Sequence, residues 1–143
     1  MVAIGSGTVV GIYAPTSDAS VGERRELRRQ VVDMLGHAPG TAICVVTGDF
    51  NAEFGRREHG DWGDVLGPHG YPRRSPTGLE WLGWCRESGF IDAASQFAQN
   101  NRSTWAHPRF GSEHALDHWL LDGRHTWHLT QCKAFHEPPA WEP

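Results

Sequence analysis

Thr41-Ala-Ile-Cys-Val-Val-Thr47, followed at once by Gly48-Asp-Phe-Asn-Ala-Glu53, is the stretch that decides the fold. Its first seven residues form a nearly unbroken apolar run of strand length, which is typical of a β-strand covered on both faces. Six residues of mixed polarity, among them a glycine, an aspartate and an asparagine, follow immediately. The stretch therefore predicts a central strand with polar side chains at its carboxyl end.

Asp49 and Asn51 leave this strand end two positions apart, so both side chains point to the same side. Hydrolysis of a phosphodiester needs a cation that neutralises the phosphate oxygens, and polar groups that hold metal, water and phosphate in line. A carboxylate such as Asp49 can orient and deprotonate water, and the amide of Asn51 can hold a phosphoryl oxygen without adding negative charge. Taken alone, the pair could equally well shape a turn.

Upstream of this stretch, the sequence predicts a second strand and a helix. Residues 8–13 are a β-branched run that ends just before Pro15, so we expect a strand that opens into a loop, with Tyr13 at its end. Ser20 and Glu23 then have the spacing of a capping box, and apolar residues recur at helical intervals up to residue 36. This segment predicts an amphipathic helix with a solvated face of arginines and glutamates.

Downstream, the sequence predicts a long loop, a second helix and several short strands. Residues 55–76 are dense in Gly, Pro, Arg, His and Asp, which is typical of a loop that is either functional or disordered. Thr77 and Glu80 have the spacing of a second capping box, and the helix that follows is expected to end at Gly89. Further strands are expected over residues 90–94, 103–106, 115–121 and 127–134.

Composition limits the classes of function. The 143 residues suit one domain, and a formal charge of -4 excludes a global positive field, so any contact with nucleic acid must be local. The three cysteines are distant from one another and odd in number, which favours reduced thiols and a nuclear or cytoplasmic location. No segment approaches the ~20 apolar residues of a membrane span, so no membrane partner is expected.

Four motifs occur in one order along the chain, each with strand-like flanks: Tyr13-Ala14-Pro15, Gly48-Asp49-Phe50-Asn51, Thr104-Trp105 and Leu116-Asp117. As a set they resemble the endonuclease/exonuclease/phosphatase superfamily. The run 48–53, the helix 78–85 and the Thr-Trp pair are most similar to its retrotransposon-type branch, which includes craniofacial development protein 2-like members. The resemblance implies an α/β (α+β) fold, the C-terminal half of a four-layer sandwich, with residues 1–135 as a partial domain and 136–143 as an unstructured tail.

The resemblance also implies roles for individual residues. Tyr13 looks like the tyrosine that contacts the scissile phosphate. Asp49 and Asn51 look like the pair that orients water and binds phosphate, and they are the expected ligands of Mg²⁺ or Mn²⁺. Asp117 is similar to the aspartate that orients the catalytic histidine. The implied activity is Mg²⁺-dependent phosphodiester hydrolysis of the endonuclease type, with DNA as the substrate.

Part of the family's catalytic set has no counterpart in this sequence. The family's N-terminal Asn and metal-binding Glu would precede Met1, and its closing Ser-Asp-His is absent downstream of Asp117. His118 is no substitute, because in a strand it would alternate to the face opposite Asp117. Since metal or acid/base catalysis is worth at least ~100-fold, we expect this chain to have weak or no activity.

Three alternatives remain open at the level of sequence. The chain could be an inactive remnant of such an enzyme, or a phosphatase of the same superfamily that acts on a phosphoester outside nucleic acids. A different class of protein is a zinc-binding module, because His114 and His118 lie at i, i+4 and His125 and His128 at i, i+3. The zinc site would require residues 114–118 to be helical.

Overall fold

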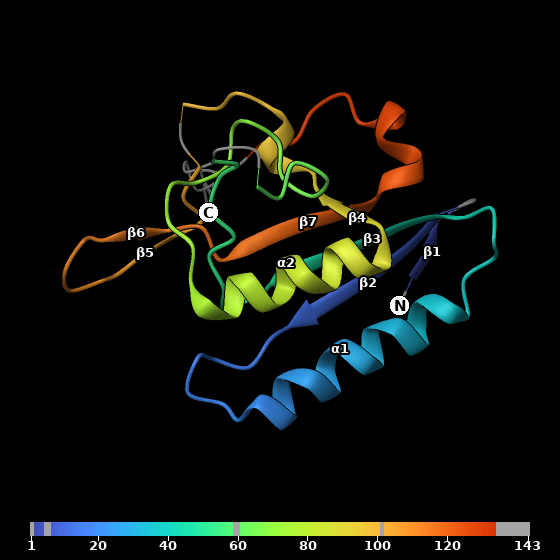
Figure 1. Ribbon diagram of the computed structural model, residues 1–143, viewed down its shortest axis with the longest axis horizontal. Helices are drawn as coiled ribbons and strands as arrows, with labels where there is room; N and C mark the ends of the chain where they lie inside the picture. Colours follow the sequence, from blue (N-terminus) through green and yellow to red (C-terminus); the bar gives the residue numbers. More distant parts are fainter. Residues whose placement is uncertain (1, 5–6, 59–60, 101, 134–143) are drawn as a thin grey trace, which may run out of the picture.

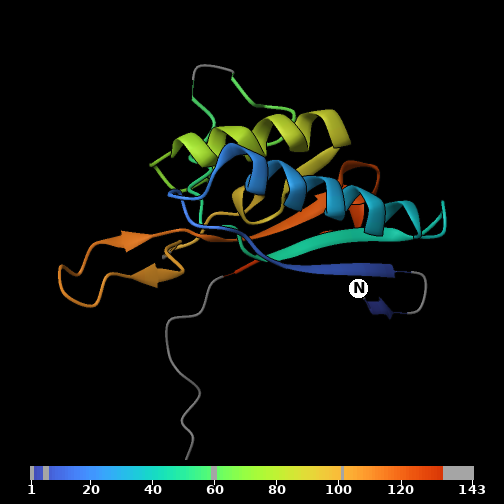
Figure 2. The ribbon, with the colours of Figure 1, turned by 90° about the horizontal axis from the view of Figure 1, so that it is seen from below.

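A five-stranded mixed sheet forms the centre of the molecule in the computed structural model, which describes residues 2–4, 7–58, 61–100 and 102–133. The strand order is β1-β2-β3-β7-β4, with bounds β1 Val2–Ile4, β2 Gly7–Tyr13, β3 Ile43–Asp49, β7 Asp117–Asp122 and β4 Phe90–Asp92. Helices α1 (Val21–Gly36) and α2 (Pro76–Ser88) lie on the same side of this sheet (Figures 1 and 2). The expected α/β class is confirmed.

The connections explain why β3 is central. β2 and β3 are parallel, and α1 is the crossover between them. β7 lies antiparallel to β3 on its other side, and β4 pairs with the far end of β7. Strand β3 has a partner on both edges and is central, as predicted, although it begins and ends two residues later than the run 41–47. The expected coverage of both faces is wrong, because burial alternates along β3 and only the side toward the helices is fully buried. The short β1, antiparallel to β2, was not predicted.

The helix ends follow local capping chemistry. The predicted box is present at α1, where the Ser20 side chain accepts from the Glu23 N–H and Glu23 accepts from the Ser20 N–H. At α2 the predicted box is wrong, because the side chain of Ser75 caps the helix and Pro76 is its first residue. Glu80 instead pairs with two arginines of α1, Arg24 at 2.9 Å and Arg28 at 3.0 Å, so this part of the arginine face joins the two helices.

The main core lies between the sheet and the two helices. Its strand contributions come from alternate positions, including the fully buried Val10, Val46 and Leu120. Two buried residues of this core, Val65 and Leu66, come from the long loop 55–75. In its described part this loop carries only turns, a bend and one isolated bridge, as expected, yet it contributes these two residues to the core.

The later part of the chain departs from the prediction in two places. A two-stranded hairpin, β5 (Trp105–Ala106) and β6 (Glu113–His114), projects beyond the sheet (Figure 1). The strand predicted over 127–134 is wrong within the described residues: Gly123–His128 form a 3₁₀ helix, η2, and the chain continues to residue 133 without a strand. Asp122 starts η2, since its carboxylate accepts from the Arg124 N–H.

Three further expectations concern chemistry rather than architecture. Cys44, Cys85 and Cys132 are free thiols, as expected. Among the described residues, no helix is long and apolar enough to cross a membrane. The tail 136–143 lies outside the described residues.

Candidate active site

Three of the four predicted site residues form one row across neighbouring strands. Tyr13, the last residue of β2, pairs with Asp49, the last residue of β3. Asp49 pairs in turn with Asp117, the first residue of β7. Paired residues point their side chains to the same face of a sheet, so the three lie together. Their face is opposite the helices, because the adjacent His118 is buried in the main core, as β alternation predicted.

Asn51, the fourth predicted residue, ties two of these strand ends together. Its backbone N–H donates to Asp49 Oδ1 at 2.8 Å, and its side-chain Nδ2 donates to the carbonyl of Ala14 at 2.7 Å. This arrangement requires a positive φ of 45°, which asparagine tolerates better than most residues. The structure thus brings all four residues together where β2 and β3 end and β7 begins. The hydrogen bonds of Asn51 that shape the turn also hold the site residues in place.

The neighbours of Asp49 fix where its carboxylate can lie. Gly48 has φ 136°, and a Cβ there would lie 2.0 Å from the Ile12 carbonyl oxygen, so only glycine allows β2 and β3 to approach so closely. Phe50 is buried and makes edge-to-face contacts with Trp81 at 4.9 Å and with Phe54 at 5.5 Å. The turn is therefore anchored in the core on one side, while Asp49 and Asn51 remain partly exposed on the other.

Asp117 is positioned by Thr104, a residue quoted in the sequence motif but given no role there. The Thr104 hydroxyl oxygen accepts from the Leu116 N–H at 3.0 Å and from the Asp117 N–H at 3.1 Å. The Asp117 side chain is exposed, and its carboxylate makes no hydrogen bond or ion pair with the described residues. It is available to an external group beside Asp49.

A second polar cluster joins the site turn to the hairpin, and sequence analysis did not identify it. Glu53 Oε1 lies 3.2 Å from His114 Nδ1 of β6 and 3.3 Å from Arg73 Nε. The Glu53 N–H donates to the Ser75 hydroxyl at 3.1 Å, which links the turn to the cap of α2. The position of Glu53, two residues after Asn51, was the only hint in the sequence that it lies near the site. Its partners Arg73 and His114 could not be predicted, because they are distant in the sequence.

The zinc alternative is wrong for the structure described. It required a helix over 114–118, whereas His114 ends β6 and His118 lies in β7 with its Nε2–H donated to the Ala52 carbonyl. In the part of the chain that the structure describes, no three His, Cys, Asp or Glu side chains gather to hold a metal. His125 and His128 face each other with ring centroids 5.8 Å apart and gain no third ligand there.

The central sheet with both helices on one side gives an α/β fold whose likeness to known proteins can be compared directly. No family model matches the sequence. The chain is 26% identical over 103 residues to craniofacial development protein 2 of Tragulus javanicus, an alignment that covers 71% of this chain and 17% of that protein. The chain thus spans about a sixth of that relative's length.

Among solved structures, the chain is similar to the 3′ phosphatase NExo from Neisseria, bound to a product DNA hairpin. The TM-score is 0.59 at 18% sequence identity, and the match covers 87% of this chain and 51% of that one. The expected resemblance is confirmed at the level of the fold, and the structural match extends over about half of that solved chain.

Proposed function

We propose that the edge formed by Tyr13, Asp49, Asn51 and Asp117 binds and slowly hydrolyses phosphodiesters of DNA with the help of Mg²⁺ or Mn²⁺. The observation that carries the proposal is the register of the three strands, which aligns a phenol and two carboxylates from distant segments beside a fixed asparagine. A purely structural turn has no need of that alignment.

The donor set fits a hard divalent cation. Asp49 and Asn51 are the ligands that the sequence predicted, and Asp117 adds a second carboxylate that faces the same side as Asp49 from a paired position. Neither aspartate has an ion-pair partner in the described ranges. Mg²⁺ is usually bound by one or two carboxylates, with water and substrate phosphate completing its shell, so a larger protein cage is not needed. When bound, the cation would neutralise charge on the phosphate oxygens.

Each side chain has a task that its contacts permit. Asp49 uses Oδ1 to accept from Asn51, which leaves Oδ2 to orient and deprotonate the attacking water. Asn51 Nδ2 donates one hydrogen to Ala14 and retains a second for a phosphoryl oxygen. Tyr13 is 75% exposed and lies at the end of the row opposite Asp117, so its hydroxyl can donate to a phosphate oxygen.

The projecting hairpin favours a nucleic acid over a small phosphoester. Its exposed side chains include Trp105, Phe110 and Arg109, and Thr104 at its base contacts the backbone of Asp117. Aromatic rings stack on bases and arginine contacts phosphates, which provides local affinity despite the net charge of -4. NExo, whose fold is similar, was determined with a DNA hairpin.

The test is cleavage of supercoiled plasmid and of a labelled duplex at high enzyme concentration, with Mg²⁺, with Mn²⁺ and with a chelator. We expect slow cleavage that requires the metal and falls at least ~100-fold in Asp49→Asn. Glu87→Gln, which changes an exposed carboxylate at the end of α2, is the matched control and should cleave normally. Metal-independent cleavage, or cleavage unchanged in Asp49→Asn, would refute the assignment.

The alternatives predict different results in the same assay. An inactive remnant would leave both DNA substrates intact with either metal. A phosphatase for small phosphoesters would release phosphate from a soluble sugar or inositol phosphate and ignore the duplex. Deletion of the hairpin tip, residues 108–111, should weaken DNA cleavage and spare hydrolysis of a small diester.

A further inference from the structure

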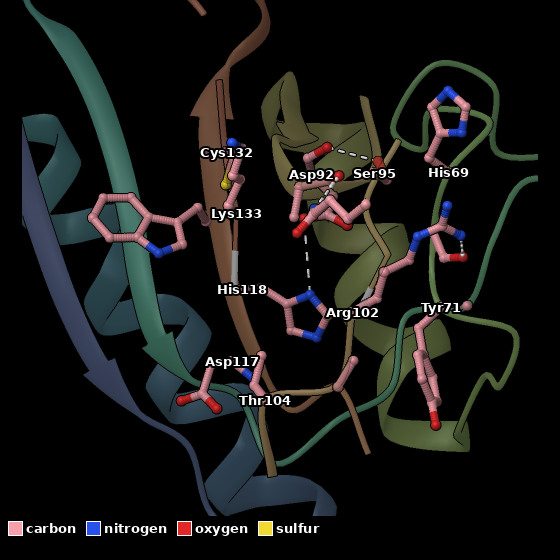
Figure 3. A pocket seen from close by; sticks show the side chains of 16 residues that line it. His69, Tyr71, Asp92, Ser95, Arg102, Thr104, Asp117, His118, Cys132 and Lys133 are labelled. Atoms are coloured by element: carbon pink, nitrogen blue, oxygen red, sulfur yellow. Dashed lines mark hydrogen bonds and ion pairs between the residues drawn. The ribbon is translucent and has the colours of Figure 1, made fainter. Parts of the chain in front are cut away.

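A cavity of about 130 Å³ lies beside the candidate active site, between β7 and residues of the described segments 92–99 and 102–104 (Figure 3). Asp117, Thr104 and Trp119 line its margin toward the site, and Asp92, His118 and Arg102 line its interior. It has room for several water molecules or one small planar ring. The proposed hydrolysis does not use it.

The interior presents two acceptors to each other. The Ala52 carbonyl can only accept, so the 2.9 Å bond to it assigns the hydrogen of His118 to Nε2. In the neutral ring Nδ1 is then an acceptor, and it lies 3.8 Å from Asp92 Oδ1, a contact that becomes an ion pair when the ring is protonated. Both residues are at least nine-tenths buried, and Asp92 Oδ1 has no hydrogen-bond partner. A buried, unmatched acceptor is costly, which indicates that a donor belongs there.

The surroundings hold this pair rigidly. His118 stacks on Phe54 with ring centroids 3.7 Å apart. The backbone of Asp92 donates to the Val65 carbonyl at 2.9 Å and accepts from the Ser95 hydroxyl at 2.7 Å. Relaxation of either side chain to find another partner is therefore restricted. A nitrogen at about 2.9 Å from each acceptor fits geometrically, because the two acceptors are separated by less than twice that length.

Arg102 supplies the complementary group. Its Nη1 donates to the Gly70 carbonyl at 3.1 Å, but its buried Nε–H has no hydrogen-bond partner. The cavity thus combines a pair of acceptors with a fixed donor. The thiol of Cys132 also lines it; burial, together with the charge of Asp92, raises the pKa of this thiol, so it stays neutral. At the margin, the half-exposed indole of Trp119 offers a flat apolar surface.

We infer that this cavity binds a nucleobase that carries an exocyclic amino group, with the amino group donating to Asp92 and His118 and the adjacent ring nitrogen or carbonyl accepting from Arg102. Cytosine, adenine and guanine each present an amino group beside an acceptor, whereas uracil and thymine present a carbonyl where the amino group would be. Because Asp117 lines both the cavity and the phosphate row, the base would be the one next to the scissile phosphate. This identification of the substrate rests on the proposed function.

Nucleosides provide the test, because they contain no phosphodiester and report on the cavity whether or not the chain cleaves DNA. Cytidine and uridine differ at the decisive position, and binding of each is followed by NMR titration of the Ala115–Trp119 amides and the tryptophan indoles. We expect cytidine to bind at least tenfold more tightly than uridine, since a site built to hydrogen-bond rejects a ligand that leaves its groups unpaired.

Asp92→Asn turns the acceptor into a group that can also donate, so the variant should lose most of the preference for cytidine and gain affinity for uridine. Glu87→Gln should leave both affinities unchanged, and thermal unfolding would verify that each variant is folded. Arg102→Met offers a second measurement, with weaker cytidine binding expected. Equal affinity for the two nucleosides, no binding of either, or an unchanged preference in Asp92→Asn would each overturn the inference. Loss of DNA cleavage with cytidine binding retained would instead count against the proposed function alone.

Discussion

The two faces of the central sheet differ in what their residues do. The face toward α1 and α2 carries Val10, Val46 and Leu120, all fully buried. The opposite face carries Tyr13, which is 75% exposed, the two aspartates of the row, and Trp119, which is 52% exposed. Because side chains alternate along every strand, one set of hydrogen bonds supports a core on one side and a chemical site on the other. Substitutions on the helix-covered face should therefore change mainly the stability, and substitutions on the opposite face mainly the candidate activity.

The largest expected effect is on the helix-covered face. Leu120→Ala should lower the free energy of unfolding by about 3 kcal/mol, because it removes buried methyl groups and leaves a cavity. Trp119→Ala, the adjacent position on the opposite face, should cost well under half as much despite the larger side chain. Chemical denaturation of both variants measures the contrast, and equal losses would refute the distinction between the faces.

The next effect should appear in activity without a matching loss of stability. Asp49→Asn keeps the shape of a partly exposed side chain, so the unfolding midpoint should move little while cleavage falls at least ~100-fold, equivalent to about 2.7 kcal/mol of transition-state stabilisation. Parallel thermal unfolding and plasmid cleavage report the two quantities. A large fall in the midpoint would mean that the carboxylate serves mainly the turn.

A smaller effect is expected at the cap of α2. Ser75→Ala removes the acceptor for the Gly78 N–H and the contact with the Glu53 N–H, and should cost about 1 kcal/mol. The matched change Thr77→Ala should cost less, because Thr77 is inside the helix and is not its cap. Urea unfolding of both variants distinguishes the two assignments, and a greater loss from Thr77→Ala would restore the capping box that the sequence predicted.

The smallest effect concerns the pairing between helices. The hydrogen bond from Arg24 lowers the pKa of Glu80 from its usual 4.5, with burial opposing the shift and Arg28 adding to it. A depressed pKa in the folded state means that this contribution is present above pH 4.5 and is lost as the pH falls through the folded value. The free energy of unfolding, measured between pH 6 and pH 3, should therefore fall less steeply in Glu80→Gln than in the unsubstituted protein. The difference over this range should be under about 1 kcal/mol, since the pair is partly exposed. Identical pH profiles would show that the pair contributes nothing.

Local signals predicted much of the fold and the site. The run 41–47 marked the central strand, Ser20 marked the start of α1, and Gly89 marked the end of α2, because hydrophobic burial and capping depend on neighbouring residues. The gathering of Tyr13, Asp49, Asn51 and Asp117 followed from family resemblance. Spacing alone left the Asp-Asn pair ambiguous.

The errors arose where one local signal competed with another, or with partners that are distant in the sequence. Thr77 and Glu80 satisfied the spacing of a cap, but Ser75 followed by Pro76 fitted the first turn better and Glu80 found arginines on another helix. Residues 123–128 became 3₁₀ helix because the Asp122 carboxylate accepts from the Arg124 N–H. The cavity beside Asp117 was beyond prediction, since Asp92, Arg102 and His118 meet only through tertiary packing.

The register of β2, β3 and β7 makes the site intolerant of changes in chain length. Deletion of one residue between Ile43 and Thr47 would have to be absorbed by shifting β3 against both neighbours. With the strand end held by Asn51, the core positions of β3 would then turn outward and its outward positions inward. Substitutions can sample the chemistry of this edge one side chain at a time, whereas insertions and deletions should be tolerated only in the loops that join the strands.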